Sequence, residues 1–495
     1  MFRSYNLYSL SAGLAKKSSQ RCLQTSTLLK QNDTSSASAT VMDYEKVKEI
    51  REKHLNPALL TLYPKPLYLT HGHMQYVYDD KNTKYLDLFG GIVTISAGHC
   101  HEKVTNALHQ QADKIWHTTN LYYHEKIHEY AEKLISKFPK DSGLTNCYFV
   151  NSGSEANDLA IMMAKLYTGR TEILSLQNGY HGASPATQGL TCHGNWKYNL
   201  PGLAGGHHYA MNADPYNGEW GGKYCRDSPV QTDRDCPCES ENDCLAKDKY
   251  DTQFDRVLQF NIGQNRLAGF WAEPIQGVGG TIQYPKGWLR NCYDKVHSMG
   301  GICIADEVQT GFGRTGTHYW GFEGENLNPD IVVMAKGIGN GFPLGALVTT
   351  DEIAKVMGKA LTFNTYGGNP LSCAVGSAVL DAIDEDKLQE NCHNMGTLFL
   401  NKLASLRDEF DIVGDVRGKG LMIAVEFVTD KQSRKPLPAA DVNTLLELCR
   451  QRGVLYGKGG INGNMFRVKP PMCINEGDVD VAVEVLRDSL KEMLA

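Results

Sequence analysis

The sequence of 495 residues predicts an α/β fold built on a mostly parallel, doubly wound sheet. One observation behind this prediction is that short apolar runs suited to buried strands alternate with segments whose apolar residues recur at helical spacing. The other is that several of these runs end in a polar residue beside a glycine-rich turn. Open α/β sheets bind their ligands at such strand ends.

The composition excludes several classes of protein. With 41% hydrophobic residues, 21% charged residues and a net charge of −6, it is ordinary for a globular protein with one large or two smaller cores. No apolar run approaches the roughly 18 residues that span a membrane. No basic segment indicates binding of nucleic acid.

The first 40 residues differ in character from the rest. Residues 1–32 are rich in serine and contain no acid, and their basic residues are Arg3, Lys16, Lys17, Arg21 and Lys30. This is the composition of an organelle transit peptide. We therefore expect residues 1–40 to be a presequence for the mitochondrial matrix, and a plain disordered tail is the alternative.

The elements of residues 41–375 are predicted in chain order. Strands at 76–78 and 85–88 flank a turn and form a hairpin. Apolar residues recur at helical spacing from 103 to about 138, and a strand at 147–150 then leads through a glycine-containing turn into a helix. The further strands are expected at 172–176, 269–272, 301–305, 330–335 and 345–349.

The pattern changes after about residue 375. Helices are predicted at 374–383, 387–410 and 477–493, and a strand near 421–428. We interpret residues 103–375 as a large domain and residues 376–495 as a smaller α/β domain. The segment 41–102 is expected to pack with the smaller domain.

Two strand ends carry the strongest chemical signal. The apolar run 302–305 ends in Asp306, and the run 331–335 is followed by Lys336 and a glycine-rich turn. At one edge of a sheet, the two side chains could hold a pyridine ring between them. The lysine amine would form an imine with an aldehyde, and the carboxylate would keep the ring nitrogen protonated. The pair therefore predicts a site for pyridoxal 5'-phosphate.

A phosphate seat is predicted where the strand at 147–150 meets its helix. Ser152 and Glu155 have the spacing of a capping box. Gly153 would let the backbone approach a ligand closely, and Ser154 adds a hydroxyl. Free amides and the helix dipole make such a helix start suitable for a phosphate.

Three more segments could complete the site. Tyr180 lies in a Gly-Tyr-His-Gly turn and could stack on a flat cofactor. Glu273 places a carboxylate at another strand end. The polar, glycine-rich loop 362–370 could reach a phosphate.

In order and spacing, these motifs resemble the class III pyridoxal-phosphate-dependent aminotransferases, and they read SGSEAND, GYHG, AEPIQG, ADEVQTGFGRTG, AKGIGNGFPLGA and TYGGNP. The resemblance extends from about residue 60 to the end and points to the mitochondrial alanine–glyoxylate group of that family. It implies fold type I, with a seven-stranded sheet in the large domain, and ping-pong transamination. It also implies a homodimer or homotetramer with shared active sites.

The resemblance implies roles for individual residues. Lys336 would be the Schiff-base lysine and Asp306 the partner of the ring nitrogen, and both would be catalytic. Thr365 would reach the phosphate of a neighbouring subunit. Arg467 would bind the substrate carboxylate. The remaining expected cofactor-binding residues are Ser152, Gly153, Ser154, Tyr180, His181, Glu273 and Gln309.

Two departures from relatives predict the substrate class. Relatives that accept glutamate generally carry an arginine where this chain has Ala183, so a second substrate carboxylate would be unpaired at a cost of about 3 to 5 kcal/mol. Many relatives carry a glutamate that masks the substrate-binding arginine where this chain has Val278, so we expect Arg467 to stay free. Both changes favour L-alanine or a small β-amino acid such as 3-aminoisobutyrate as donor. Glyoxylate or pyruvate would be the acceptor, and alanine with glyoxylate would give pyruvate and glycine.

The insertion at about 205–250 is not explained by the resemblance. We interpret it as a polar loop in which the clustered cysteines are Cys225, Cys236, Cys238 and Cys244. Binding of zinc and formation of a disulfide are both alternatives for these cysteines. We favour reduced thiols, and we predict no metal site. The histidines at 71, 73, 99 and 101 are interpreted as polar turn residues.

Other functions stay open from the sequence. A decarboxylase or an aminomutase would share nearly every cofactor contact. An inactive scaffold would have no need for Lys336 and Asp306. The interpretation as a nicotinamide oxidoreductase rests only on the GxGxxG pattern at 311–316. No ordinary amphipathic helix follows this pattern.

Overall fold

The computed structural model describes residues 41–495 except 199, 201–204, 236–237, 239–243 and 361. The presequence predicted at 1–40 therefore lies outside the described residues. The chain forms two compact units, Met1–Pro57 and Ala58–Ala495. The described part of the first unit holds helix α1 (Tyr44–His54), which begins where the Asp43 carboxylate accepts two backbone amides. All other described elements belong to the second unit.

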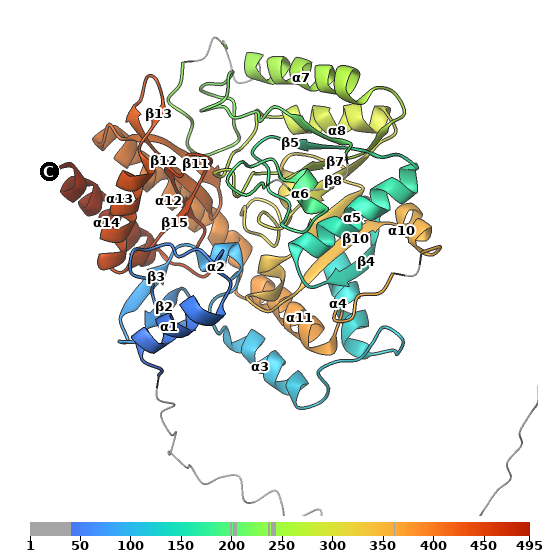
Figure 1. The fold of residues 1–495 in the computed structure, drawn as a ribbon, viewed down its shortest axis with the longest axis horizontal. Coiled ribbons are helices and arrows are strands. Elements are labelled where there is room, and N and C mark those ends of the chain that lie inside the picture. Colours follow the sequence, from blue (N-terminus) through green and yellow to red (C-terminus); the bar gives the residue numbers. More distant parts are fainter. Residues whose placement is uncertain (1–40, 199, 201–204, 236–237, 239–243, 361) are drawn as a thin grey trace, which may run out of the picture. The chain divides into compact units, whose positions relative to one another are not determined.

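A seven-stranded sheet forms the centre of the second unit (Figure 1). Its strand order is β4-β10-β9-β8-β7-β5-β6, in which only β10 is antiparallel to its neighbours. The strands are β4 (Leu144–Val150), β5 (Glu172–Leu176), β6 (His207–Ala210), β7 (Leu267–Ala272), β8 (Ile302–Asp306), β9 (Ile331–Met334) and β10 (Gly345–Thr350). The predicted α/β fold with a mostly parallel seven-stranded sheet is confirmed, although the sequence patterns miss β6.

The strands divide their side chains between two hydrophobic clusters, because successive residues of a strand point to opposite faces. In β8, Ile302 and Ile304 pack in the cluster that contains α5 (Gly153–Thr168), whereas Cys303 lies in the other. Both faces of the sheet are therefore buried. This explains why its strands read as continuous apolar runs.

Helices surround this sheet. The longer ones besides α5 are α3 (Glu102–Ala112), α4 (Glu125–Ile135), α7 (Leu245–Val257), α8 (Trp288–Ser298), α10 (Asp351–Met357) and α11 (Pro370–Glu385). Short helical turns are α2 (Gly90–Val93), α6 (Thr187–Leu190), η1 (Leu258–Ile262), α9 (Gly321–Gly324) and η2 (Lys336–Gly339). Within the described ranges, no helix combines the length and the apolar character of a membrane span.

The helical spacing noted from 103 to about 138 corresponds to two helices, α3 and α4, and fails in the segment between them. The chain leaves helix after Ala112 and re-enters it at Glu125, where His124 Nδ1 accepts the amide of Lys126. The apolar residues in between lie at the surface, with Tyr123 97% exposed. Helical spacing stabilises a helix only where its apolar face packs on a core, and these side chains have no such core.

The carboxy-terminal part forms a second sheet with the order β11-β12-β16-β15, and β13 pairs with β12. Its strands are β11 (Val413–Lys419), β12 (Met422–Asp430), β13 (Lys435–Pro436), β15 (Gly457–Gly459) and β16 (Met465–Val468). Its helices are α12 (Leu388–Glu409), α13 (Ala439–Gln451) and α14 (Glu476–Leu494). Of these, the sequence patterns predict α12, α14 and β12.

The predicted hairpin is present as β2 (Tyr76–Asp79) and β3 (Lys84–Asp87). Together with β1 (Leu69–His73) it forms a sheet to which β14 (Val454–Leu455) adds a strand parallel to β3. Gln75 Nε2 also donates to the carboxylate of Asp478 in α14 at 2.7 Å. These contacts join the hairpin to the carboxy-terminal part (Figure 1), and the domain boundaries stay a prediction.

The insertion at 205–250 is not wholly a loop, because it contains β6 and the start of α7. Cys225 is buried, Cys238 and Cys244 are half-buried, and Cys236 lies outside the described residues. The sulfurs of Cys225 and Cys244 are 3.5 Å apart, and this hydrogen bond lowers the pKa of the Cys244 thiol to about 6. The role of these cysteines stays a prediction.

Candidate functional site

The predicted phosphate seat lies at the junction of β4 and α5. Ser152 is the N-cap, and its hydroxyl accepts the amide of Glu155 at 3.3 Å. The reciprocal half of the predicted capping box is absent, because the Glu155 carboxylate accepts the amide of Asn151 instead. A Cβ at Gly153 would lie 3.1 Å from Val308 Cγ2, so the helix start is closely packed. The first-turn amides of this 16-residue helix have no intrahelical acceptor and can serve an anion.

A cavity of about 150 Å³ opens in front of this helix start. Its lining comes from the ends of β4, β7, β8 and β9 and from the turn at 179–182, and consists of Ser152, Gly153, Ser154, Asn157, Tyr180, His181, Gly182, Glu273, Asp306, Val308, Gln309, Ala335 and Lys336. All of the predicted cofactor-binding residues line it except Thr365. Thr365 is exposed in the loop before α11. The structure thus brings nine predicted residues together from distant parts of the chain.

The Asp306 carboxylate is fixed in position at the end of β8. Its Oδ2 accepts hydrogen bonds from His181 Nδ1 at 2.8 Å and from Asn157 Nδ2 at 2.9 Å. Burial opposes protonation of His181, but the hydrogen bond and charge of Asp306 prevail and raise the pKa of the imidazole. The contact with Asp306 therefore favours the protonated form of His181 more than burial alone would.

Asn157 is a functional residue that the sequence patterns miss. It is buried in α5, and its Oδ1 accepts the indole N–H of Trp271 at 3.2 Å while its Nδ2 donates to Asp306. An amide among the buried alanines and leucines of α5 could have signalled this role, because buried polar groups need partners.

Lys336 follows β9 and adopts a left-handed backbone conformation with φ of 54°. Burial, together with the charge of Arg467, lowers the pKa of its amine to about 8, while Asp306 and Glu273 oppose this shift. A larger share of the amine is therefore uncharged near neutral pH than for an ordinary lysine. An uncharged amine is the form that attacks a carbonyl carbon.

Glu273 holds two turns of the site together. Its buried carboxylate accepts the amide of Gly277 at 2.6 Å and the amide of Tyr180 at 3.2 Å. Burial raises the pKa of this carboxyl group, and the electrostatic effect of the nearby His181 opposes the shift. Glu273 therefore orients the turn that carries Tyr180.

Arg467 lies on β16 outside the cavity lining but contacts it. Its Nη2 donates to Gln309 Oε1 at 3.0 Å, its guanidinium lies 5.3 Å from the ring centre of Phe89, and its Nε has no partner among the described residues. A Cβ at Gly459 would lie 2.2 Å from Arg467 Cδ, so only glycine leaves room there. Burial lowers the pKa of Arg467 to about 10.

No ion pair joins Arg467 to an acid in the described ranges, and its hydrogen bond goes to the neutral amide of Gln309. Lys469 is a second residue that the sequence patterns miss, and its Nζ donates to the same Gln309 oxygen at 3.0 Å. The sequence feature that could have indicated it is a lysine within the otherwise apolar run after Arg467.

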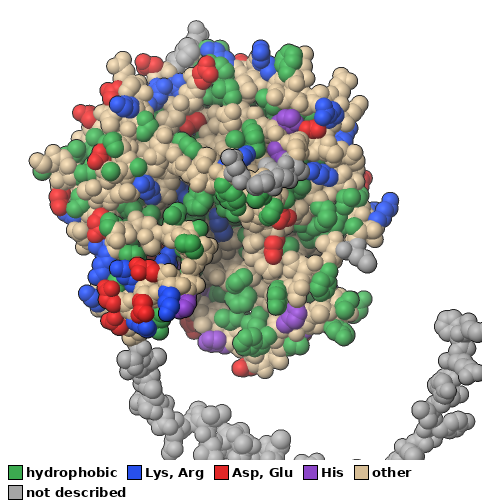
Figure 2. Space-filling model, viewed as in Figure 1, with side chains coloured by type: hydrophobic (Ala, Val, Ile, Leu, Met, Phe, Trp, Pro, Cys, Tyr) green, Lys and Arg blue, Asp and Glu red, His purple; other side chains and the backbone are tan. Residues whose placement is uncertain are grey.

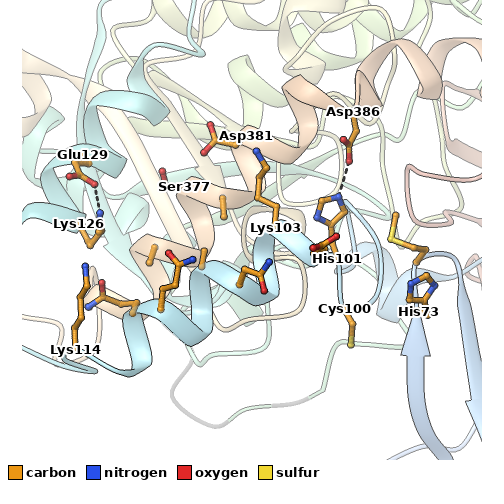
Figure 3. A pocket seen from close by; sticks show the side chains of 18 residues that line it. His73, Cys100, His101, Lys103, Lys114, Lys126, Glu129, Ser377, Asp381 and Asp386 are labelled. Carbon is orange, nitrogen blue, oxygen red and sulfur yellow. Dashed lines mark hydrogen bonds and ion pairs between the residues drawn. The ribbon is translucent and has the colours of Figure 1, made fainter. Parts of the chain in front are cut away.

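A larger cavity of about 860 Å³ runs along α3, away from these residues (Figure 3). Two pairs of its lining side chains bind each other, Lys126 with Glu129 at 2.7 Å and His101 with Asp386 at 2.8 Å. None of the predicted site residues lines it. We therefore assign the chemistry to the smaller cavity.

The described residues contain one grouping of side chains with the spacing of metal ligands, His297, Cys303 and Asp330. There, Asp330 Oδ2 already accepts hydrogen bonds from His297 Nε2 at 2.8 Å and from the amide of Cys303 at 2.7 Å. The carboxylate is thus used in joining α8 to β8.

The class-III aminotransferase family model matches residues 63–490. The mitochondrial alanine–glyoxylate aminotransferase 2 of Homo sapiens is 50% identical over 452 residues, which cover 91% of this chain and 87% of that protein. The mitochondrial alanine–glyoxylate aminotransferase 2 homolog 2 of Arabidopsis thaliana is 44% identical over 443 residues, covering 90% and 87%.

Solved structures give the same fold. An amine transaminase from an uncultivated Pseudomonas species, in its PLP-bound form, superposes with a TM-score of 0.79 at 30% identity, covering 88% of this chain and 98% of that one. A phospholyase from Arthrobacter in complex with phosphoethanolamine gives a TM-score of 0.79 at 29% identity, covering 90% and 99%. The fold therefore supports more than one reaction.

Proposed function

Since this chain belongs to the class-III aminotransferases, we propose that it moves the amino group of L-alanine, or of a small β-amino acid such as 3-aminoisobutyrate, to glyoxylate or pyruvate. The observation that carries this proposal is that Lys336 lines the same cavity as Asp306, whose carboxylate is fixed by two hydrogen bonds. With alanine and glyoxylate the products are pyruvate and glycine.

The residues of the cavity suit pyridoxal 5'-phosphate. When bound, this cofactor supplies an aldehyde for the amine and an electron-withdrawing ring. The helix start at Ser152, Gly153 and Ser154 would hold its phosphate, and Asp306 its ring nitrogen. Tyr180 would cover the ring, and Gln309 would donate to the ring hydroxyl. The donor set fits because it offers anion-binding amides at one end and a carboxylate with an amine at the other.

Lys336 is proposed to move the proton of the reaction. Its lowered pKa would let the amine take a proton from the substrate α-carbon and return it to the carbon that the cofactor's aldehyde supplies. A positioned general base of this kind contributes about 10² to 10⁴ in rate. The same residues serve both half-reactions, which is what a ping-pong mechanism requires.

The proposed substrate class follows from the residues that would surround the carboxylates of a bound substrate. Arg467 has an unpartnered Nε and no acidic partner in the described part of the chain, so it can grip one carboxylate as a fork. Val278 is buried and apolar, and Ala183 is small and exposed. Neither offers a charge to a second carboxylate, which favours monocarboxylates.

The assembly is proposed to be a homodimer or homotetramer with shared sites. Large apolar side chains are exposed in the segment between α3 and α4 and in the loop before α11, namely Ile115, Trp116, Leu121, Tyr122, Tyr123, Phe363 and Tyr366. The rings of His117 and Tyr366 are 5.4 Å apart, so the two segments are neighbours. Figure 2 shows hydrophobic side chains at the surface of this face of the molecule. A second copy would cover them and bring Thr365 to the phosphate.

The mitochondrial matrix is the proposed location. Relatives from human and Arabidopsis are named mitochondrial, and the basic, serine-rich composition of residues 1–32 supports the same destination.

Steady-state rates test the proposed reaction. The purified holoenzyme is expected to turn over alanine with glyoxylate faster than glutamate with 2-oxoglutarate, and faster turnover of the second pair would contradict the substrate class. Release of carbon dioxide from alanine would indicate a decarboxylase instead.

A further inference from the structure

Lys469 carries a buried amine that the mechanism above does not use. It follows β16, its side chain is fully buried, and its backbone amide donates to Leu88 O at 2.7 Å. Its Nζ donates to Gln309 Oε1 at 3.0 Å and to Gly277 O at 3.3 Å. Burial, and then the charge of Arg467, holds the pKa of this amine well below its usual range. An amine in such a place is costly unless its hydrogen bonds are needed.

Gln309 is the acceptor that Lys469 and Arg467 share. Both side chains donate to Gln309 Oε1 at 3.0 Å. The amide is also packed tightly, because a Cβ at Gly277 would lie 2.4 Å from Gln309 Cδ. With the oxygen occupied by two donors, the amide NH₂ is the group that Gln309 can offer to the cavity that it lines.

A substrate carboxylate would compete for one of these two donors. The free Nε of Arg467 and its Nη2 form one face of the guanidinium fork, and Nη2 already serves Gln309. A carboxylate on that face takes one N–H of Nη2 and draws the guanidinium toward itself, which weakens the bond that the other N–H of Nη2 can make to Gln309 Oε1. Lys469 is the second side-chain donor to this oxygen in the described structure.

We propose that Lys469 is a positioning residue that holds Gln309 Oε1 while Arg467 binds the substrate carboxylate. The amide of Gln309 then keeps its orientation toward the cavity throughout the reaction cycle. This inference rests on the proposed function and deepens it. In this proposal Lys469 is the second donor that holds the neutral amide of Gln309 when a substrate carboxylate weakens its bond to Arg467.

The test uses acetate, an unreactive monocarboxylate, titrated into the holoenzyme, so that binding is measured without turnover. Lys469→Met is expected to weaken acetate binding about tenfold, the size of one hydrogen bond to a charged group, because Gln309 then depends on Arg467. The KM for glyoxylate should rise by the same factor while kcat changes less. Lys419→Met is the control, because Lys419 pairs with Asp227 outside the site.

A double-mutant cycle with Gln309→Met separates positioning from a general structural effect. In that background the acceptor is gone, so Lys469→Met should not weaken acetate binding further. An equal loss in both backgrounds, or unchanged affinity in folded Lys469→Met, would overturn the proposal. If Lys469→Met does not fold, Lys469→Gln is used with the same expectation, because the shorter glutamine side chain would not reach Gln309 Oε1. Absence of transamination by the wild-type enzyme would refute the proposed function, while the acetate affinities would still decide the role of Lys469.

Discussion

The side-chain amide of Asn157 donates to the carboxylate of Asp306 at 2.9 Å, and this contact joins α5 to the end of β8. The helix start that offers anion-binding amides and the carboxylate that faces the cavity therefore belong to one hydrogen-bonded unit. His181 donates to the same oxygen at 2.8 Å. The position of Asp306 is thus fixed before any ligand binds.

Replacing Asn157 with leucine should weaken binding of pyridoxal 5'-phosphate by roughly tenfold to a hundredfold, because a hydrogen bond to a charged group contributes about 1.5 to 3 kcal/mol. The dissociation constant is measured by reconstituting the apoenzyme. Asn146→Leu is the control, since Asn146 lies on β4 and donates to Thr145. Equal affinity of the Asn157→Leu protein and the wild type would show that the contact does not orient Asp306.

The lowered pKa of Lys336 predicts how the apoenzyme reacts with the cofactor aldehyde. Lysine attacks as the uncharged amine, so the fraction that reacts rises with pH until the pKa is passed. With a pKa of about 8, the rate of imine formation should level off above roughly pH 9. Stopped-flow absorbance between pH 6 and pH 10.5 measures this rate. A rate that still climbs at the top of this range would mean an ordinary lysine, and Lys336→Ala should show no imine at all.

Ala183 is predicted to limit the use of dicarboxylates. It is exposed, and its amide donates to Ser154 Oγ at 3.2 Å, so a longer side chain at this position has room beside the site. Ala183→Arg should raise kcat/KM for glutamate relative to alanine by at least about tenfold, because it supplies a partner to the second carboxylate. Ala186→Arg, three residues further on and also exposed, is the matched control. A similar gain in both variants would mean that an added arginine attracts anions in general, and would contradict a specific role of position 183.

The residues at strand ends could be predicted from the sequence because their pattern is local. A buried strand followed by a polar residue and glycines places Asp306 and Lys336 at the sheet edge whatever the rest of the chain does. Partnerships across the fold have no such local pattern. Asn157 meets Asp306 across 149 residues, and Lys469 meets Gln309 across 160. These contacts depend on how helices and sheets pack, which spacing along the chain does not encode.

The same reasoning explains the errors in the predicted elements. The apolar residues between α3 and α4 have helical spacing but no core beneath them, and they lie at the surface of a single chain. Strand β11 contains arginine, lysine and glycine, β15 contains lysine and glycine, and β16 contains arginine, so none of them reads as an apolar run. In β15 glycine is required by the bulk of the Arg467 side chain that packs against it.

The exposed position of Thr365 predicts that each site is completed by a second copy of the chain. Lys336→Ala removes the amine, and Thr365→Asp places a negative charge where a phosphate is expected, so each variant alone should be inactive at limiting cofactor. When the two are co-expressed and mixed dimers are purified with two different tags, one site of each dimer has an intact Lys336 and an intact Thr365 only if Thr365 acts across the interface. Recovery of transamination in the mixed dimers is therefore expected. If Thr365 served its own subunit, both sites would stay defective and the mixed dimers would be as inactive as their parents. If Thr365 served no subunit, the Thr365→Asp protein alone would already be active, which would contradict the prediction.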